Sequence, residues 1–216
     1  MRSKEIEDRK LNLKLSDYQR EIVVGLLLGD GHLETQNGGR TYRLKIEHTY
    51  RQKEYTDWLY RIFKDWVITP PQEKKQTVWG VEYKKYWFST LSHGAFRFYG
   101  KQFYKQKRKI IPRLIGKWLT PVAMAIWFMD DGSIKSKRHR ALILNTQSFT
   151  KPELIGLIEV VKKKFGVEMT FRKQRDLYQL AVSGESAKKF ADIVRPYILP
   201  SMAYKLGLLG NTLPKK

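Results

Sequence analysis

The sequence predicts an α+β fold made of two pseudo-symmetric repeats, each with the element order αββαββα. The duplication is indicated by two short helices that are apolar on all sides. Each ends in the same dipeptide, Asp30-Gly31 in one and Asp131-Gly132 in the other. The same succession of strands and helices follows each dipeptide. This period of about 100 residues places the first repeat over 1–117 and the second over 118–216.

The opening helix of each repeat spans Tyr18–Gly29 in the first and Val122–Asp130 in the second. Neither helix has a polar stripe, and helices of this kind are buried, so we expect the two to pack against each other. Thr120 supplies an N-cap for the second helix, and Pro121 is a proline in its first turn.

A strand is expected next in each repeat. Thr41–Thr49 alternates between apolar and polar residues, with Leu44 and Ile46 on the inward face. Its counterpart, His139–Gln147, is apolar on both faces, which leaves open which of its residues face outward.

The remaining elements also occur in pairs. Each strand is followed by an amphipathic helix, and the second of these helices begins with a capping box of Thr150 and Glu153. A hairpin, another helix and a proline element then complete each repeat. In chain order the pairs are the helices Lys53–Trp66 and Pro152–Phe165, the hairpins Thr77–Leu91 and Val167–Val182, the helices Gly94–Tyr104 and Glu185–Val194, and the elements Ile111-Pro112 and Leu199-Pro200.

The composition favours a folded protein that binds polyanions. The 216 residues carry 42 Lys and Arg against 21 Asp and Glu, a formal net charge of +21, yet 42% are hydrophobic, which is enough for a core. A surplus of this size favours nucleic acid, whose phosphates basic side chains neutralise, over a merely solvated basic surface. Cysteine is absent, which excludes disulfides, Cys-ligated zinc and a thiol nucleophile.

The sequence also predicts a soluble, intracellular protein. Its longest apolar runs, Ile22–Leu28 and Val122–Met129, are far shorter than the roughly 20 residues that cross a bilayer. The first ten residues lack the hydrophobic stretch of a signal peptide and contain acids that a transit peptide avoids.

The two Asp-Gly ends are candidate metal sites. Asp-Gly alone is a common turn dipeptide in which the glycine caps the helix, and this structural interpretation stays open for either one. However, Asp30 and Asp131 both lie at the C-terminal end of a buried helix, where the macrodipole disfavours an anion by about 0.3–1 kcal/mol. A cation between the carboxylates would offset that cost, and Mg²⁺ prefers oxygen ligands. A metal that faces a basic surface can promote phosphodiester hydrolysis.

These residues carry a resemblance to a known family. The segments VVGLLLGDG (Val23–Gly31) and MAIWFMDDG (Met124–Gly132) resemble the two motifs of the single-chain LAGLIDADG homing endonucleases. In the second half, LNTQSFT (Leu144–Thr150) and PYILPSMAYKL (Pro196–Leu206) are similar to an intron-encoded member from yeast mitochondria. The resemblance covers nearly the whole chain.

The resemblance implies that the two motif helices form the interface between the repeats and that each repeat forms a four-stranded sheet, a saddle on DNA. It implies that Asp30 and Asp131 bind the catalytic Mg²⁺ or Mn²⁺, helped by the main-chain carbonyls of Gly29 and Asp130. The carboxylate of Asp130 is an alternative ligand, although its side chain is expected to point elsewhere on the helix.

A lysine near each active site is also implied. The matching positions are Lys109 and Lys205, while Lys117 competes with Lys109 because it follows Pro112 at the spacing at which Lys205 follows Pro200.

The second motif departs from the family pattern at Ile126, where a glycine is common. Close approach of the two helices must therefore rely on Ala125 and on Gly25 and Gly29. The histidines, among them His48, show no metal-ligand spacing, and for His32 a structural role is favoured.

Outward strand positions and basic side chains are the candidates for DNA contact, since Arg pairs with guanine and Gln with adenine edges. They are Arg40, Arg43, Lys45, Glu47, Thr49, Lys84, Arg138, Arg140, Arg172 and Gln179.

The activity that the resemblance implies is metal-dependent cleavage of both DNA strands at a long asymmetric site, by a monomer, leaving short 3′ overhangs. An intron RNA maturase on the same scaffold is the alternative, with the host intron RNA as partner. A non-catalytic DNA-binding regulator ranks third, because no helix-turn-helix is evident. The implied location is an organelle matrix or stroma, or a bacterial cytoplasm.

Overall fold

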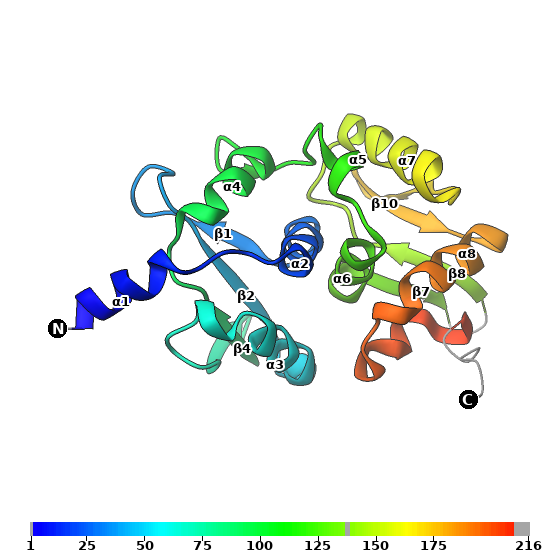
Figure 1. The fold of residues 1–216 in the computed structure, drawn as a ribbon. Helices are drawn as coiled ribbons and strands as arrows, with labels where there is room; N and C mark the ends of the chain where they lie inside the picture. The colour runs from blue at the N-terminus through cyan, green and yellow to red at the C-terminus, as the bar shows by residue number, and fades with distance from the viewer. Residues whose placement is uncertain (1, 137–138, 210–216) are drawn as a thin grey trace. The chain divides into compact units, whose positions relative to one another are not determined.

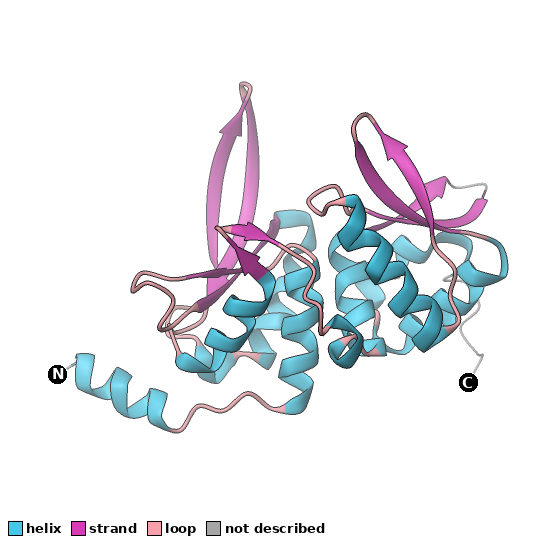
Figure 2. Cartoon of the chain, turned by 90° about the horizontal axis from the view of Figure 1, so that it is seen from above, coloured by secondary structure: helices cyan, strands magenta, loops and turns pink. Residues whose placement is uncertain are grey.

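The computed structural model describes residues 2–136 and 139–209, which form two compact units (Figure 1). The first unit comprises Met1–Val23 and Asp30–Lys101, and the second comprises Val24–Gly29 and Gln102–Lys216. Each unit contains a four-stranded antiparallel sheet, with the strand order β1-β2-β4-β3 in the first and β7-β8-β10-β9 in the second. In both units the helices lie on one side of the sheet (Figure 2). The identical strand order confirms the predicted duplication.

The repeat boundary at residue 117 stays a prediction, because the compact units divide the chain differently. Residues 102–117 belong to the second unit, and helix α2 (Asp17–Leu28) contributes its last turn to that unit as well.

In the first unit α3 packs on β2 and β4. Strand β2 shows the predicted alternation, with Leu44 and Ile46 buried and Thr49 exposed. The elements are α1 (Arg2–Leu11), β1 (His32–Glu34), β2 (Arg43–Thr49), η1 (Tyr50–Gln52), α3 (Lys53–Ile62), η2 (Lys64–Trp66), β3 (Gln72–Val78), β4 (Val81–Ser89), η3 (Gly94–Phe96) and α4 (Arg97–Phe103), whose last turn extends into the second unit.

The second unit confirms both predicted helix caps. The Thr120 side chain accepts a hydrogen bond from the Ala123 amide at 3.2 Å, and Thr150 forms the capping box with Glu153. The elements are β5 (Tyr104–Lys105), β6 (Arg108–Lys109), α5 (Ile115–Trp118), α6 (Pro121–Asp131), β7 (Gly132–Ser136), β8 (His139–Leu144), α7 (Lys151–Phe165), β9 (Thr170–Gln174), β10 (Leu177–Val182), α8 (Gly184–Val194), η4 (Arg195–Tyr197) and η5 (Pro200–Leu209).

Strand β8 ends at Leu144, earlier than predicted. It lies against both α8 and η5, which explains why Leu142, Ile143 and Leu144 are all buried. Arg140 is the exposed residue near the start of this strand, and the half-buried Asn145 follows directly after its end.

Helix α1 is absent from the sequence prediction because it lacks an apolar face. It is held to its unit by Arg9, whose guanidinium donates hydrogen bonds to the carbonyls of Lys64, Asp65 and Val67 at the end of η2. Among the described residues, every helix is too short or too polar to serve as a membrane span.

The turn between β3 and β4 contains an unfavourable residue. Trp79 and Gly80 both have positive φ, at 49° and 77°, and the Trp79 side chain is 98% exposed. Tight hairpin turns with two positive φ values favour Asn-Gly, because a bulky L-residue is strained in the left-handed region.

We therefore expect Trp79→Asn to raise the free energy of unfolding by about 1 kcal/mol, the lower end of the cost of left-handed backbone in an ordinary residue. Urea denaturation measures this change. Trp79→Ala keeps the strain and is the control, so an Asn variant no more stable than the Ala variant would contradict the argument.

Candidate metal centre and nucleic-acid interface

Helix α6 and the last turn of α2 approach each other at backbone distance, within the second unit. A Cβ atom at Gly25 would lie 2.6 Å from the Ala123 carbonyl oxygen and 2.6 Å from the Ile126 Cβ. The glycine thus leaves a notch that the larger Ile126 side chain fills. The predicted use of Gly25 is confirmed, and the atoms nearest to it belong to Ala123 and Ile126, while the role of Ala125 stays a prediction.

One turn further on, Gly29 leaves space for the carboxylate of Asp130. A Cβ at Gly29 would overlap the Asp130 side chain, including its Oδ2 atom. Asp130 is 7% exposed, so its carboxylate is buried against the end of α2. Gly29 and Asp130 occupy equivalent positions, each just before the acid of its motif. The two motifs therefore differ here, because one has a glycine and the other an aspartate.

Each of these two equivalent residues has a carbonyl oxygen that accepts a hydrogen bond from a lysine. Lys109 Nζ donates to the Gly29 carbonyl at 2.7 Å, and Lys205 Nζ donates to the Asp130 carbonyl at 2.8 Å and to the Met129 carbonyl. Lys117 is exposed on α5. Geometry thus makes Lys109 the counterpart of Lys205.

Lys109 reaches this position through a hairpin that no pattern in the sequence predicts. Strands β5 and β6 pair Tyr104 with Lys109, and the turn between them places Gln106 and Lys107 at φ of 49° and 65°. The charged sequence of this hairpin gives no alternation that could reveal a strand.

The glycine after α6 does not adopt the left-handed conformation that is common for a glycine that caps a helix. Gly132 has a φ of −77°, and a Cβ there would overlap the Phe128 ring and its carbonyl oxygen. Close packing explains this glycine. The end of the helix is instead fixed by Asn145, whose main-chain amide and Nδ2 donate to the Asp131 carbonyl at 3.0 and 2.9 Å.

In the first unit, Asp30 is exposed and lies close to a histidine. A carboxylate oxygen of Asp30 and a ring nitrogen of His48 are within 4.8 Å of each other, and His48 Nδ1 is 2.9 Å from Thr56 Oγ1. The inward alternation of β2, which runs through Leu44 and Ile46 to His48, is the sequence signal that could have indicated this histidine.

The donors around both acids suit a hard divalent cation. Carboxylate and main-chain carbonyl oxygens are the groups that bind Mg²⁺ and Mn²⁺. The ammonium groups of Lys109 and Lys205 donate hydrogen bonds to the carbonyl oxygens of Gly29 and Asp130. Positive charge is therefore already accommodated next to these two oxygens.

On the exposed face of β2, basic and acidic side chains form ion pairs. Arg43 Nη2 lies 2.6 Å from Glu34, and Lys45 lies 3.7 Å from Glu34 and from Glu47. Burial alone would raise the pKa of Glu34, but the hydrogen bonds from Arg43 and His32 and the nearby positive charges outweigh it and leave that pKa below its ordinary value. His32 Nε2 lies 3.1 Å from Glu34 Oε1, a contact that fits the structural role favoured for this histidine.

Lys84 lies on the other face of the sheet from these residues. Cross-strand pairing puts Lys85 opposite both Thr49 and Lys74, so these three share the exposed face, and the neighbouring Lys84 faces away. Lys84 binds Glu73 at 2.5 Å and lies over the ring of Tyr50. Lys84 is exposed on that other face, and its contact with DNA stays a prediction.

Of the remaining candidates, Arg40, Arg140 and Arg172 are exposed, whereas Gln179 is 6% exposed. Gln179 accepts a hydrogen bond from Arg172 and donates one to Asn145. It therefore helps to orient Arg172, and little of its own side chain is accessible to DNA. Arg138 lies outside the described residues.

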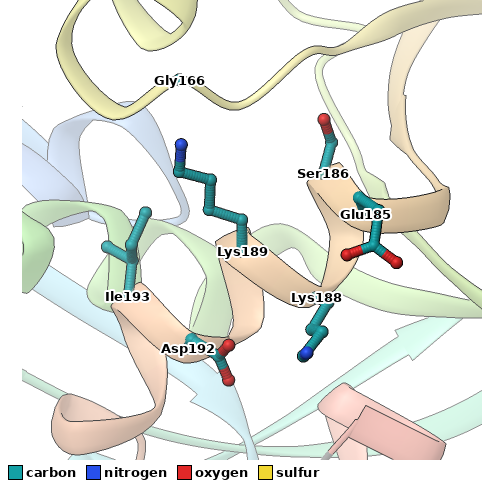
Figure 3. A pocket seen from close by; sticks show the side chains of 7 residues that line it. All are labelled: Gly166, Glu185, Ser186, Lys188, Lys189, Asp192 and Ile193. Atoms are coloured by element: carbon teal, nitrogen blue, oxygen red, sulfur yellow. The ribbon is translucent and has the colours of Figure 1, made fainter.

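A surface pocket of about 570 Å³ lies beside α8 (Figure 3). None of the predicted site residues lines it, and its charged side chains are two lysines and two acids. Its lining residues are Gly166, Glu185, Ser186, Lys188, Lys189, Asp192 and Ile193.

Comparison with known proteins gives consistent matches along the chain. The LAGLIDADG DNA endonuclease family matches residues 20–190. The chain is 32% identical to probable intron-encoded endonuclease 1 of Wickerhamomyces canadensis, over 94% of this chain and 90% of that protein. It is 31% identical to the cytochrome b mRNA maturase bI2 of Debaryomyces hansenii, over 91% of this chain and 76% of that protein. The solved structure of the homing endonuclease I-WcaI bound to its DNA recognition sequence matches with a TM-score of 0.88 and 29% identity, covering 93% of this chain and 91% of that one.

Proposed function

This chain belongs to the LAGLIDADG DNA endonuclease family, and on that premise we propose that it cleaves both strands of a long asymmetric DNA site, using Mg²⁺ or Mn²⁺ and leaving short 3′ overhangs. The observation that carries the proposal is the repeated lysine arrangement. Lys109 and Lys205 each bind the carbonyl of the residue just before an acid, Asp30 in one motif and Asp131 in the other.

In this mechanism Asp30 and Asp131 would each hold a divalent cation, with the carbonyls of Gly29 and Asp130 as neighbouring donors. When bound, the metal polarises the scissile phosphate and lowers the pKa of the attacking water. Lys109 and Lys205 fix the two carbonyls and add positive charge near the position where the leaving oxygen becomes negative. The exposed basic residues of the two sheets hold the DNA backbone.

Incubation with a randomised DNA library and Mg²⁺, followed by sequencing of the cut ends, tests this proposal. We expect a defined set of sites with short 3′ overhangs, and no cut ends from the Asp30→Asn/Asp131→Asn double variant. A wild-type protein that produces no cut ends with Mg²⁺ or Mn²⁺ would refute the nuclease.

Lys109 and Lys117 offer a matched pair of substitutions. We expect Lys109→Met to slow cleavage by about 10- to 100-fold, as the loss of groups that orient metal ligands does, because the Gly29 carbonyl loses its ammonium partner. Lys117→Met should stay within about twofold of wild type. Single-turnover rates on a site from the library measure both, and a slower Lys117 variant would reverse the assignment.

RNA maturation is the second candidate function, and the 31% identity to a cytochrome b mRNA maturase favours it. The same basic strand surfaces would bind the host intron RNA, and this activity needs neither motif acid. A splicing assay with the Asp30→Asn/Asp131→Asn double variant separates the two activities. Splicing by a maturase should survive the loss of both acids, whereas DNA cleavage should not.

The protein acts as a monomer in this proposal, because one chain carries both motifs. Its repeats are 1–117 and 118–216. Names of relatives that refer to introns and to cytochrome b mRNA support a place of action in an organelle matrix or stroma, with a bacterial cytoplasm as the alternative.

A further inference from the structure

Three polar side chains form a chain of hydrogen bonds across the sheet of the second unit. Asn145 Nδ2 donates to the Asp131 carbonyl at 2.9 Å, Gln179 Nε2 donates to Asn145 Oδ1 at 2.6 Å, and Arg172 Nη1 donates to Gln179 Oε1 at 3.3 Å. This series, called here the amide relay, runs from an exposed arginine to the last residue of α6.

The strand register explains why the relay forms. Gln179 pairs directly with Arg172, and Leu180 pairs with Leu144, which sets Asn145 opposite Gln179 one step along the ladder. Directly opposed side chains on one face of an antiparallel pair are close enough to bond.

The two ends of the relay fix the orientation of both amides. A guanidinium only donates, so the oxygen of Gln179 faces Arg172 and its nitrogen faces Asn145. The Asp131 carbonyl only accepts, so the nitrogen of Asn145 faces Asp131. Both constraints are met at once, and Gln179 is buried with its oxygen and its nitrogen both bonded.

Among the described residues of the first unit, the corresponding positions do not form an equivalent series. His32 and Ser133 lie two residues after their motif acids and pair with Lys45 and Ile143, so Glu47 corresponds to Asn145. By the same register, Trp87 and Gln72 correspond to Gln179 and Arg172. The Trp87 indole donates but does not accept, so it cannot pass a hydrogen bond on.

We propose that Asn145 and Gln179 are positioning residues that couple Arg172, a DNA-contacting side chain in the proposed function, to Asp131. Arg172 keeps several N–H donors for a phosphate or a guanine while Nη1 stays on Gln179. The relay fixes the Asp131 carbonyl, and with it the peptide from which the carboxylate projects. Because it exists in one unit, it acts on the cleavage of one DNA strand.

Strand-specific cleavage of an end-labelled site provides the first test. We expect Gln179→Met to slow, by about 10- to 100-fold, the strand most affected by Asp131→Asn, and to leave the other strand within about twofold, so that nicked DNA accumulates. Gln72→Met, at the position of the first unit that corresponds to Arg172, is a glutamine-to-methionine control outside the relay and should produce no such bias. Equal slowing of both strands, or a change in DNA affinity alone, would overturn the proposal.

The second test does not depend on cleavage. Arg172 is exposed, so Arg172→Met leaves the core intact, and we expect it to shift the side-chain amide signals of Asn145 in a ¹⁵N correlation spectrum, assigned by their loss in Asn145→Leu. Unchanged Asn145 signals would overturn the coupling. If the wild-type protein cut no DNA, the proposed function would fail while this measurement still decided whether the relay exists.

Discussion

Asp131→Asn and Asp30→Asn are each expected to abolish double-strand cleavage and leave DNA binding nearly unchanged. Asparagine keeps the shape of the side chain but removes the negative charge that would hold a divalent cation in the proposed function. Loss of a group that merely orients a metal ligand costs about 10- to 100-fold, so loss of the ligand should exceed 100-fold. Single-turnover cleavage with Mg²⁺ and gel-shift titration with Ca²⁺ measure the two properties.

Asp65→Asn is the control for these variants, because Asp65 is an exposed aspartate, like Asp30, but belongs to neither motif. It should cut at the wild-type rate. If both motif variants also cut at that rate, the metal mechanism would be wrong.

Gly25→Ala is expected to lower the free energy of unfolding by about 1–3 kcal/mol, the usual cost of overpacking a core. The added methyl would lie 2.6 Å from the Ala123 carbonyl oxygen and from Ile126, so α6 must move away from the last turn of α2. Denaturant titration followed by circular dichroism measures the change.

Gly156→Ala is the matched control, because it is the same substitution in a helix. Gly156 is exposed within α7, and nothing lies within 4 Å of the position its Cβ would take. Alanine should therefore stabilise the protein by about 0.5–1 kcal/mol, since glycine is unfavourable inside a helix. If Gly25→Ala were neutral or stabilising as well, the two helices would not be as close as described.

The sequence predicts those elements that have one buried face or a local cap. The alternation in β2 and the capping box of Thr150 and Glu153 are local patterns, and the structure confirms both. Strand β3 begins at Gln72, five residues before the predicted hairpin at Thr77, because its residues are polar on both faces. The β5–β6 hairpin and α1 were not predicted for the same reason.

The candidate site divides in a similar way. Recurrence along the chain indicates Asp30 and Asp131, but spacing alone cannot choose between Lys109 and Lys117, because an unpredicted hairpin carries Lys109 to the Gly29 carbonyl. Gln179 and Asn145 are 34 residues apart, and their bond depends on the pairing of β10 with β8. Contacts of this kind follow from strand register, which a single sequence does not specify.

The place where Gly29 receives the carboxylate of Asp130 has a consequence for engineering. The two motifs cannot be interchanged, because one supplies a notch and the other the group that enters it. A symmetric homodimer built from two copies of the second half would bring aspartate against aspartate at this point, with both a steric clash and like charges. Converting one of the two to glycine would be the minimum change needed to let such copies associate.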